Sequence, residues 1–159
     1  MLASLALLLL FSSTTGAPSV TPAPQLRPLT LCSAISQSQV ELAVGRKLEA
    51  AAPEYSRLTS TCDYTSNETA VRIAVQHLIE PLDLATEIAT LKAAFPGSVL
   101  AAVEGLGTRA MVLSIPDAGI QLHVLRGDRE YLLVSVMGAG NAQHTFEAAA
   151  EIARALLRR

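Results

Sequence analysis

Three segments with strand-like alternation, separated by turn-forming residues, most limit what this chain can fold into. They are Thr108–Ile115, Gly119–Arg126 and Glu130–Met137. The connections Pro116-Asp117-Ala118-Gly119 and Arg126-Gly127-Asp128-Arg129 are rich in Gly, Pro and Asp, the residues that favour tight turns. Strands joined by such short turns pair antiparallel. The sequence therefore predicts an antiparallel meander at the centre of a sheet.

The last hairpin of this meander decides which side chains share a face. We expect Gly127-Asp128 to form a two-residue loop, so that alternate residues of both strands point the same way. One face then holds the cross-strand pairs Val124/Tyr131, Leu122/Leu133 and Ile120/Ser135. The other face holds Leu125/Glu130, His123/Leu132 and Gln121/Val134. The first face is predicted to lie in the core, and the second is mixed in polarity.

The mixed face is the candidate binding surface. A helix could cover it and give a three-layer structure, or it could form a groove for a partner protein or a small apolar ligand. In the second case the candidate ligand-binding or partner-binding residues are His123, Leu125, Leu132 and Val134.

The remaining periodic segments predict an α+β fold. Ser36-Gln37-Ser38-Gln39 forms a capping box for a helix that reaches Val44, and Gly45 ends this helix. Two more helices are expected, from Asp83 to about Phe95 and from near Asn141 onward. Further strands are expected at Thr61–Thr65, Thr69–Leu78 and Ser98–Val103, with no more than a short strand in Arg46–Ser60. We therefore expect a largely antiparallel sheet of about six strands packed with three helices, an α/β sandwich.

The first thirty residues read as an export signal and a linker. The apolar run Leu2–Phe11 suits the central region of a signal peptide and is shorter than the ~20 residues that span a bilayer. We expect a signal peptide at residues 1–17, a proline-rich linker at 18–30 and one globular domain at 31–159. The protein would then be secreted, periplasmic or located in the cell envelope. The alternative is an apolar tail on a cytosolic protein.

The chain has two cysteines, Cys32 and Cys62. In an exported protein, an even count favours a structural disulfide between them. Such a bond would stabilise the fold by roughly 3–4 kcal/mol through loop-closure entropy. A redox or metal-binding pair is the alternative, but there is no CxxC spacing and no nearby third ligand in the sequence.

Composition and motifs argue against several functions. The formal net charge is −2 and aromatic residues make up 4% of the chain. The basic residues are scattered, so we expect no nucleic-acid partner. The sequence has no GxGxxG or P-loop pattern, and the histidines (His77, His123 and His144) lack the spacing of a zinc site, so we expect no cofactor and no metal. Asp117, Asp128 and Glu130 lie in expected turns or at a strand end, where solvated acids are common.

Three stretches of the sequence carry a resemblance: Leu31 to Gly45, Cys62 to Tyr64 and Gly105 to Ala110. Together they resemble a family of small exported bacterial domains of unknown function, typified by actinobacterial envelope lipoproteins. The stretch Leu31 to Val40, ending at Gly45, is similar to that family's opening pattern L-C-S-L-L-T-x-x-E-V…G. Cys62-Asp63-Tyr64 resembles its C-x-Y, and Gly105 to Ala110 resembles its G-L-G-D-x-A. Gln39 and Thr108 replace the usual acids, and the lipobox is missing. The resemblance implies an α/β sandwich stapled by a disulfide at the first helix, and it supplies no catalytic residues.

These observations favour an exported, non-catalytic domain. We expect it to bind a protein partner or a small apolar ligand at the cell envelope, and to meet the membrane only through its export signal. The alternative is a secreted, hydrolase-like enzyme whose site is built from loops.

Overall fold

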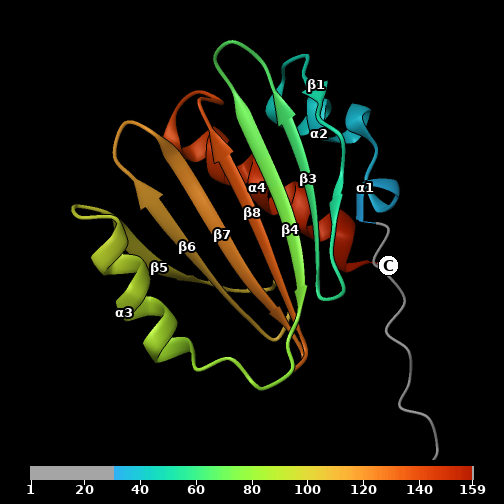
Figure 1. Cartoon of the computed structure of the whole chain (residues 1–159). Coiled ribbons are helices and arrows are strands. Elements are labelled where there is room, and N and C mark those ends of the chain that lie inside the picture. The colour runs from blue at the N-terminus through green and yellow to red at the C-terminus, as the bar shows by residue number, and fades with distance from the viewer. Residues whose placement is uncertain (1–30, 159) are drawn as a thin grey trace, which may run out of the picture.

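The protein folds as an antiparallel sheet with helices on both faces (Figure 1), which confirms the α+β prediction. The computed structural model describes residues 31–158, apart from the side chains of Leu84, Ala85 and Ile88. The helices are α1 (Leu31–Ala34), α2 (Gln37–Val44), α3 (Leu84–Ala94) and α4 (Ala142–Leu157). The strands are β1 (Glu49–Ala50), β2 (Glu54–Tyr55), β3 (Thr59–Thr65), β4 (Ala70–His77), β5 (Val99–Val103), β6 (Arg109–Ile115), β7 (Gly119–Arg126) and β8 (Glu130–Met137).

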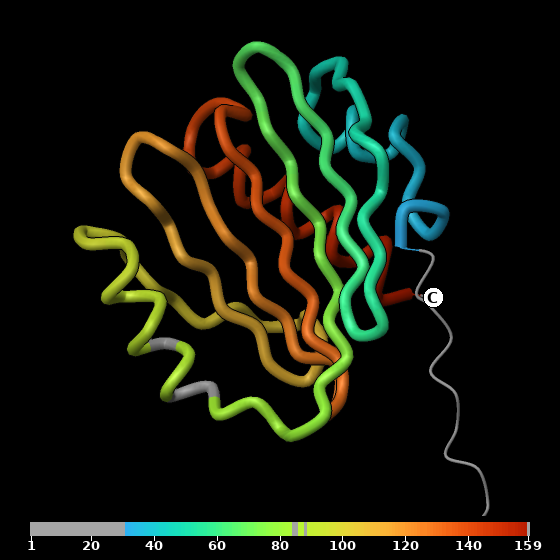
Figure 2. Tube along the Cα trace, viewed as in Figure 1, coloured from blue at the N-terminus to red at the C-terminus, as the bar shows by residue number. Residues whose placement is uncertain are grey.

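The sheet has the order β1-β3-β4-β8-β7-β6-β5, and β2 also pairs with β3. Figure 2 shows the backbone passing through successive antiparallel hairpins, with β4 and β8 side by side at the centre. Helix α4 packs on β7 and β8 and contacts α2. Helix α3 lies on the opposite side of the sheet, near β5 and β6 (Figure 1). The described strands number eight rather than about six because two two-residue strands pair with the outer side of β3, and α1 adds a fourth helix.

The register of the β7–β8 hairpin differs from the sequence-based prediction. Arg126 pairs with Glu130, so the loop has the three residues between them and the predicted two-residue loop is wrong. Gly127 takes the left-handed backbone conformation there, with φ of 62°, which glycine adopts without steric cost. A shift of one residue moves every side chain of a strand to the other face. The pairs on the core face are therefore Ile120/Val136, Leu122/Val134 and Val124/Leu132.

This register brings six apolar side chains together beneath α4. All six are at most 2% exposed. The predicted register would instead have placed Tyr131 and Ser135 in this layer and left Val134 and Val136 on the mixed face. Burying a Val or Leu side chain contributes about 1.5–3 kcal/mol, so hydrophobic burial favours the observed pairing.

Helix α4 begins at Asn141, as predicted, because the Asn141 side chain accepts a hydrogen bond from the His144 backbone N–H at 2.9 Å. This satisfies one of the amides that a helix start leaves without an intrahelical partner. The helix faces the sheet with small side chains and two larger apolar ones. The buried residues of α4 are Thr145, Ala148, Ala149, Ala150, Ile152, Ala153 and Leu156. Small alanine side chains let a helix axis approach the strands closely.

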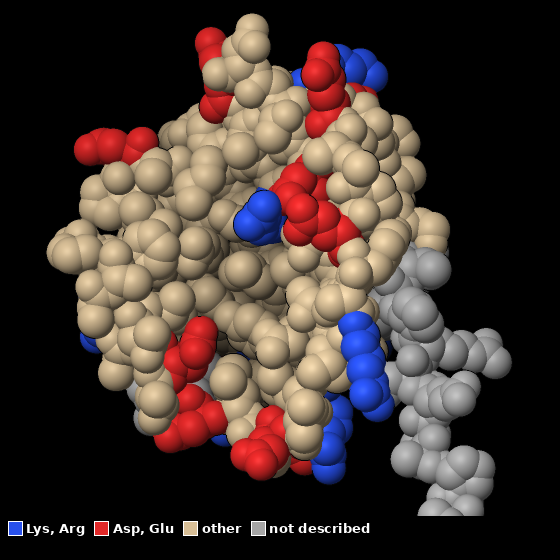
Figure 3. All heavy atoms as spheres, viewed as in Figure 1, with Lys and Arg blue, Asp and Glu red and all other residues tan. Residues whose placement is uncertain are grey.

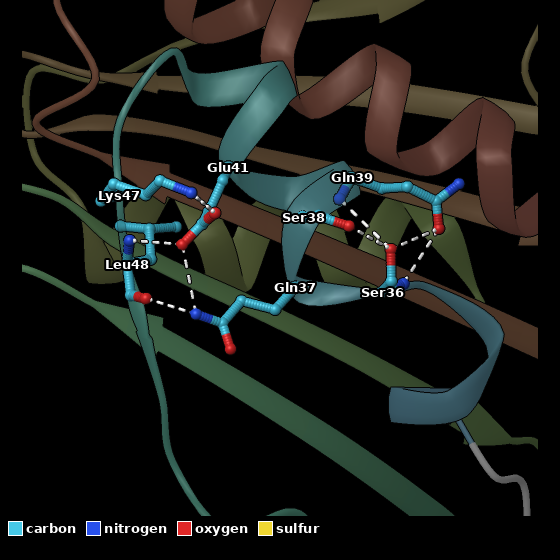
Figure 4. A network of polar contacts seen from close by, with 7 residues as sticks. All are labelled: Ser36, Gln37, Ser38, Gln39, Glu41, Lys47 and Leu48. Carbon is cyan, nitrogen blue, oxygen red and sulfur yellow. Dashed lines mark hydrogen bonds and ion pairs between the residues drawn. The ribbon is translucent and has the colours of Figure 1, made fainter.

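Helix α2 has the capping box that the sequence predicts. The Ser36 hydroxyl accepts from the Gln39 backbone N–H, and the Gln39 side chain accepts from the Ser36 backbone N–H at 2.9 Å. Gly45 ends the helix in the left-handed conformation. Figure 4 shows a second polar group on the same helix, in which Glu41 accepts from the Leu48 backbone N–H and from Lys47. The Leu48 N–H, the Lys47 ammonium and the Gln37 amide lower the pKa of Glu41 to about 2.

A disulfide joins Cys32 on α1 to Cys62 on β3, which confirms the predicted pairing. The two Cα atoms are 5.6 Å apart, within the usual range for a cystine. Cys62 is buried on the helix-covered face of β3 together with Ser60 and Tyr64. The bond therefore fixes α1, and α2 after it, over the β3 end of the sheet. Disulfides persist in oxidising compartments, so this bond indicates such a location.

The predictions for residues 1–17 and 18–30 lie outside the described residues. Within residues 31–158, no helix is long and apolar enough to cross a membrane.

Replacing both cysteines by serine should lower the free energy of unfolding by roughly 3–4 kcal/mol, because the reduced chain regains the loop-closure entropy of a 30-residue separation. Urea denaturation of the oxidised protein and of the Cys32→Ser/Cys62→Ser variant measures the difference. The wild-type protein with reductant is the matched control and should behave like the variant. Equal midpoints for all three samples would show that the bond contributes nothing to stability.

Candidate functional site

The face of the sheet opposite α4, here called the second face, is hollowed in its middle (Figure 3). The register places its side chains in rows that run across the strands. One row consists of Thr61, Ala74, Leu133, His123 and Met111. The rows on either side are Asp63, Arg72, Ser135, Gln121 and Leu113, and Thr59, Gln76, Tyr131, Leu125 and Arg109. Strands β7 and β8 thus give this face a floor of neutral side chains, both polar and apolar.

Helix α3 covers one part of the second face and leaves the rest open. Leu113, on β6, is fully buried, and His123 on β7 is 4% exposed. By contrast, Arg72 and Gln76 on β4 are exposed. Leu91 of α3 and Phe95, which follows the helix, are half-buried, while the described residues on the other side of α3 are exposed. The sequence left two alternatives, a face covered by a helix and an open groove. The face is covered at β6 and β7 and open at β4.

A histidine–tyrosine pair lies where the covered part meets the open part. His123 Nδ1 and the Tyr131 hydroxyl form a hydrogen bond. His123 Nε2 is buried and has no hydrogen-bond partner among the described residues. A neutral imidazole carries one N–H and one lone pair. In one tautomer Nε2 carries an N–H without an acceptor, and in the other it carries a lone pair without a donor. Leaving a buried polar group unsatisfied in this way costs about 1–3 kcal/mol.

Burial keeps both members of this pair uncharged. Loss of hydration lowers the pKa of His123 to about 4. Burial, and then the negative charge of Glu87 on α3, raise the pKa of Tyr131. At neutral pH the pair therefore presents hydrogen-bonding groups without a formal charge.

An ion pair lies on the exposed part of the second face. Arg72 donates from Nε and Nη2 to the two carboxylate oxygens of Asp63, at 2.7 and 2.9 Å. Asp63 raises the pKa of Arg72, and Glu54 adds a smaller contribution of the same sign. The Arg72 side chain is 59% exposed, so solvent screening leaves this pair little net stabilising energy. Because the ion pair is bidentate, the Arg72 guanidinium is held in the row that contains Asp63 and Ser135.

The structure brings together two of the four predicted binding residues. His123 and Leu125 both lie on the second face, two residues apart on β7. Leu132 and Val134 lie on the opposite face beneath α4, at 2% and 0% exposure, because of the one-residue difference in register. Their places on the second face are taken by Tyr131 and Leu133. The alternation in Glu130–Met137 would have indicated these two residues if the hairpin loop had been assigned three residues.

Asp117, which an enzyme could pair with a histidine, lies on the other side of the sheet from His123. It is in the β6–β7 turn and lines a cleft of about 410 Å³ near the start of α4, together with Ala142 and Thr145. A neighbouring groove of about 520 Å³ runs between α4 and β5–β6, lined by Val112, Phe146 and other residues. The separation of Asp117 from His123 by the sheet prevents them from acting as an acid–base pair.

Among the described residues there is no cluster of three His, Cys, Asp or Glu side chains that could hold a metal ion. Comparisons with protein-family models, curated proteins and solved structures found no significant match.

Acidification should destabilise the fold through His123. The unfolded histidine takes up its proton near pH 6.5 and the folded one near pH 4, so the unfolded state binds more protons as pH falls between these values. The free energy of unfolding should therefore fall over this interval, by about 3 kcal/mol in all from this group. Urea denaturation at pH 7 and pH 4.5 should show a smaller loss for His123→Gln than for wild type.

His77→Gln removes a different imidazole from the same sheet and serves as the matched control, which should keep the wild-type loss. Histidine side-chain NMR should also show one imidazole that stays neutral to near pH 4. Protonation of all three histidines above pH 6 would contradict the buried environment of His123.

Proposed function

We propose that this protein is an exported, non-catalytic binding domain that takes a small, largely apolar and uncharged ligand in the hollow of the second face. The observation that carries the proposal is the composition of this hollow. Its floor combines the apolar Leu133 and Ala74 with the neutral hydrogen-bonding groups of Gln121, Ser135 and Tyr131. Apolar surface with a few convergent polar groups is the usual lining of a small-molecule site.

The charges around the second face support an uncharged ligand. Arg72 is already engaged by Asp63 and so offers no free cation to an anionic group. His123 and Tyr131 are neutral at physiological pH for the reasons given above. Arg109 lies on the same face at its β6 side, where it lines a separate cleft with Leu125 and Asp128. A charged ligand over Leu133 and Ala74 would lose its hydration without a charged partner beside it. An apolar body with one or two hydroxyl, carbonyl or amide groups fits best.

Helix α3 forms one wall of the proposed site. The chain enters α3 from the end of β4 and leaves it for β5 (Figure 1), so the helix is tied to the sheet at both ends. A ligand entering between α3 and the central strands would come close to His123 Nε2, whose hydrogen-bonding capacity is unused. A hydrogen bond there would offset the cost of the unsatisfied group and make binding stronger than apolar contact alone.

Export is the second part of the proposal. The Cys32–Cys62 disulfide supports an oxidising destination, and the apolar run Leu2–Phe11 supports a signal peptide. We also propose that the chain is related to the exported bacterial domains whose pattern it resembles. The disulfide and the capped α2 stand at the positions where that pattern has its cysteines and its first helix. The location would be the cell envelope or the outside of the cell.

A neutral naphthyl dye, 1-N-phenylnaphthylamine, tests the binding surface by its fluorescence gain on entering an apolar site. The wild-type protein should bind it saturably, and Leu133→Gln should weaken binding by at least about tenfold, since one buried Leu contact is worth about 1.5–3 kcal/mol. Ala74→Leu, which fills the hollow without adding a polar group, should also weaken binding.

Leu42→Gln makes the same exchange on α2, where the side chain is 77% exposed, and it is the matched control. Its dye affinity should equal that of the wild type. Circular dichroism identifies variants that have lost their fold. Unchanged affinity in folded Leu133→Gln and Ala74→Leu, or no saturable binding by the wild type, would count against the second face.

A further inference from the structure

The two edges of the sheet are built differently. At one edge, the outer side of β3 is occupied by β1 and β2, which have two residues each, begin with Glu49 and Glu54 and are separated by Pro53. Short strands, charges and proline are the features that protect a sheet edge from pairing with other strands. The other edge is β5, whose sequence is Val-Leu-Ala-Ala-Val. It has none of these features.

Strand β5 has a free side for strand pairing. Among the described strands it pairs with β6 alone, in register from Val99/Ser114 to Val103/Ala110. Its opposite side therefore presents backbone N–H and C=O groups that no neighbouring strand uses. Val99 is 65% exposed, and Ala101 and Ala102 are exposed as well. An apolar edge strand of this kind is a template for a further strand.

We propose that β5 pairs antiparallel with β5 of a second copy of this chain, about a two-fold axis at Ala101. In this register Val99 lies opposite Val103 of the second copy, and Leu100 lies opposite its Ala102. Apolar side chains thus meet apolar side chains at every pair of the strand. Just beyond the strand, Glu104 lies opposite Ser98 of the other copy, so no like charges face each other.

The symmetry of the strand is the reason to favour a second copy over a different protein. A two-fold contact requires one patch to be complementary to itself. The strand Val-Leu-Ala-Ala-Val has valine at both ends, alanine at the centre and no charge. Val99, Ala101 and Val103 share the α4 side of the sheet, as the register with β6 shows. The same three residues of the second copy would continue this row, and the two sheets would join into one.

A charge-exchange experiment tests the pairing. Ala101 lies on the axis, so Ala101→Lys places two ammonium groups opposite each other, and Ala101→Glu places two carboxylates there. Like charges directly opposite destabilise a strand pair. Sedimentation equilibrium of the purified, oxidised protein should show a concentration-dependent wild-type dimer. Each single variant should raise the dimer Kd at least tenfold, and an equimolar mixture of the two variants should restore association.

Leu42→Lys adds the same charge at an exposed site on α2 and should leave the dimer unchanged. Hydrogen exchange on the wild-type protein gives a readout that needs no variant, because the β5 amides should gain protection as protein concentration rises. A wild-type protein that stays monomeric at about 1 mM would overturn the proposal. Unchanged association of Ala101→Lys, failure of the mixture to associate, or a different strand gaining the protection would do so as well.

Discussion

The register of the β7–β8 hairpin is the constraint on which the rest of the structure depends. With Arg126 opposite Glu130, three apolar residues from each strand face α4. A shift by one residue would move one of these rows to the opposite side of the sheet. Strand β4 then pairs with β8 and adds Val71, Ile73 and Val75 to the same layer. The alanine-rich side of α4 packs on this apolar layer. The hairpin therefore determines both the buried core and the composition of the opposite face.

Local signals in the sequence predicted the parts of this fold that depend on local chemistry. Ser36 and Gln39 form their reciprocal cap, and Asn141 starts the last helix, because each uses a partner three residues away. The strand limits of β7 and β8 were also predicted correctly. The loop between them was not, since Gly-Asp suits both a two-residue and a three-residue turn. Hydrophobic burial decides between the two loops, because only the three-residue loop places Val134 and Val136 in the core beneath α4.

Half of the candidate site could be predicted for the same reason. His123 and Leu125 belong to β7, and the alternation of apolar and polar residues within β7 predicts which face they lie on. The face of Leu132 and Val134 on β8 was instead inferred from the register of the hairpin. The Tyr131 partner of His123 depends on that register too. The position of α3 is a long-range property, since a helix between β4 and β5 could have packed on either side of the sheet. Its placement over β6 buries Leu113 and His123 and leaves the β4 side of the hollow open.

The disulfide at α1 has a geometric consequence for how this domain is carried. Helix α1, with which the described chain begins, and the end of α4 both lie beside the β3 edge (Figure 1). Five strand intervals separate β3 from β5, a distance of roughly 24 Å at about 4.8 Å per strand. A linker or domain joined at either of these ends would be attached at the edge of the sheet that carries the Cys32–Cys62 disulfide. The β5 edge and the hollow of the second face would then lie away from the point of attachment and stay accessible to binding partners.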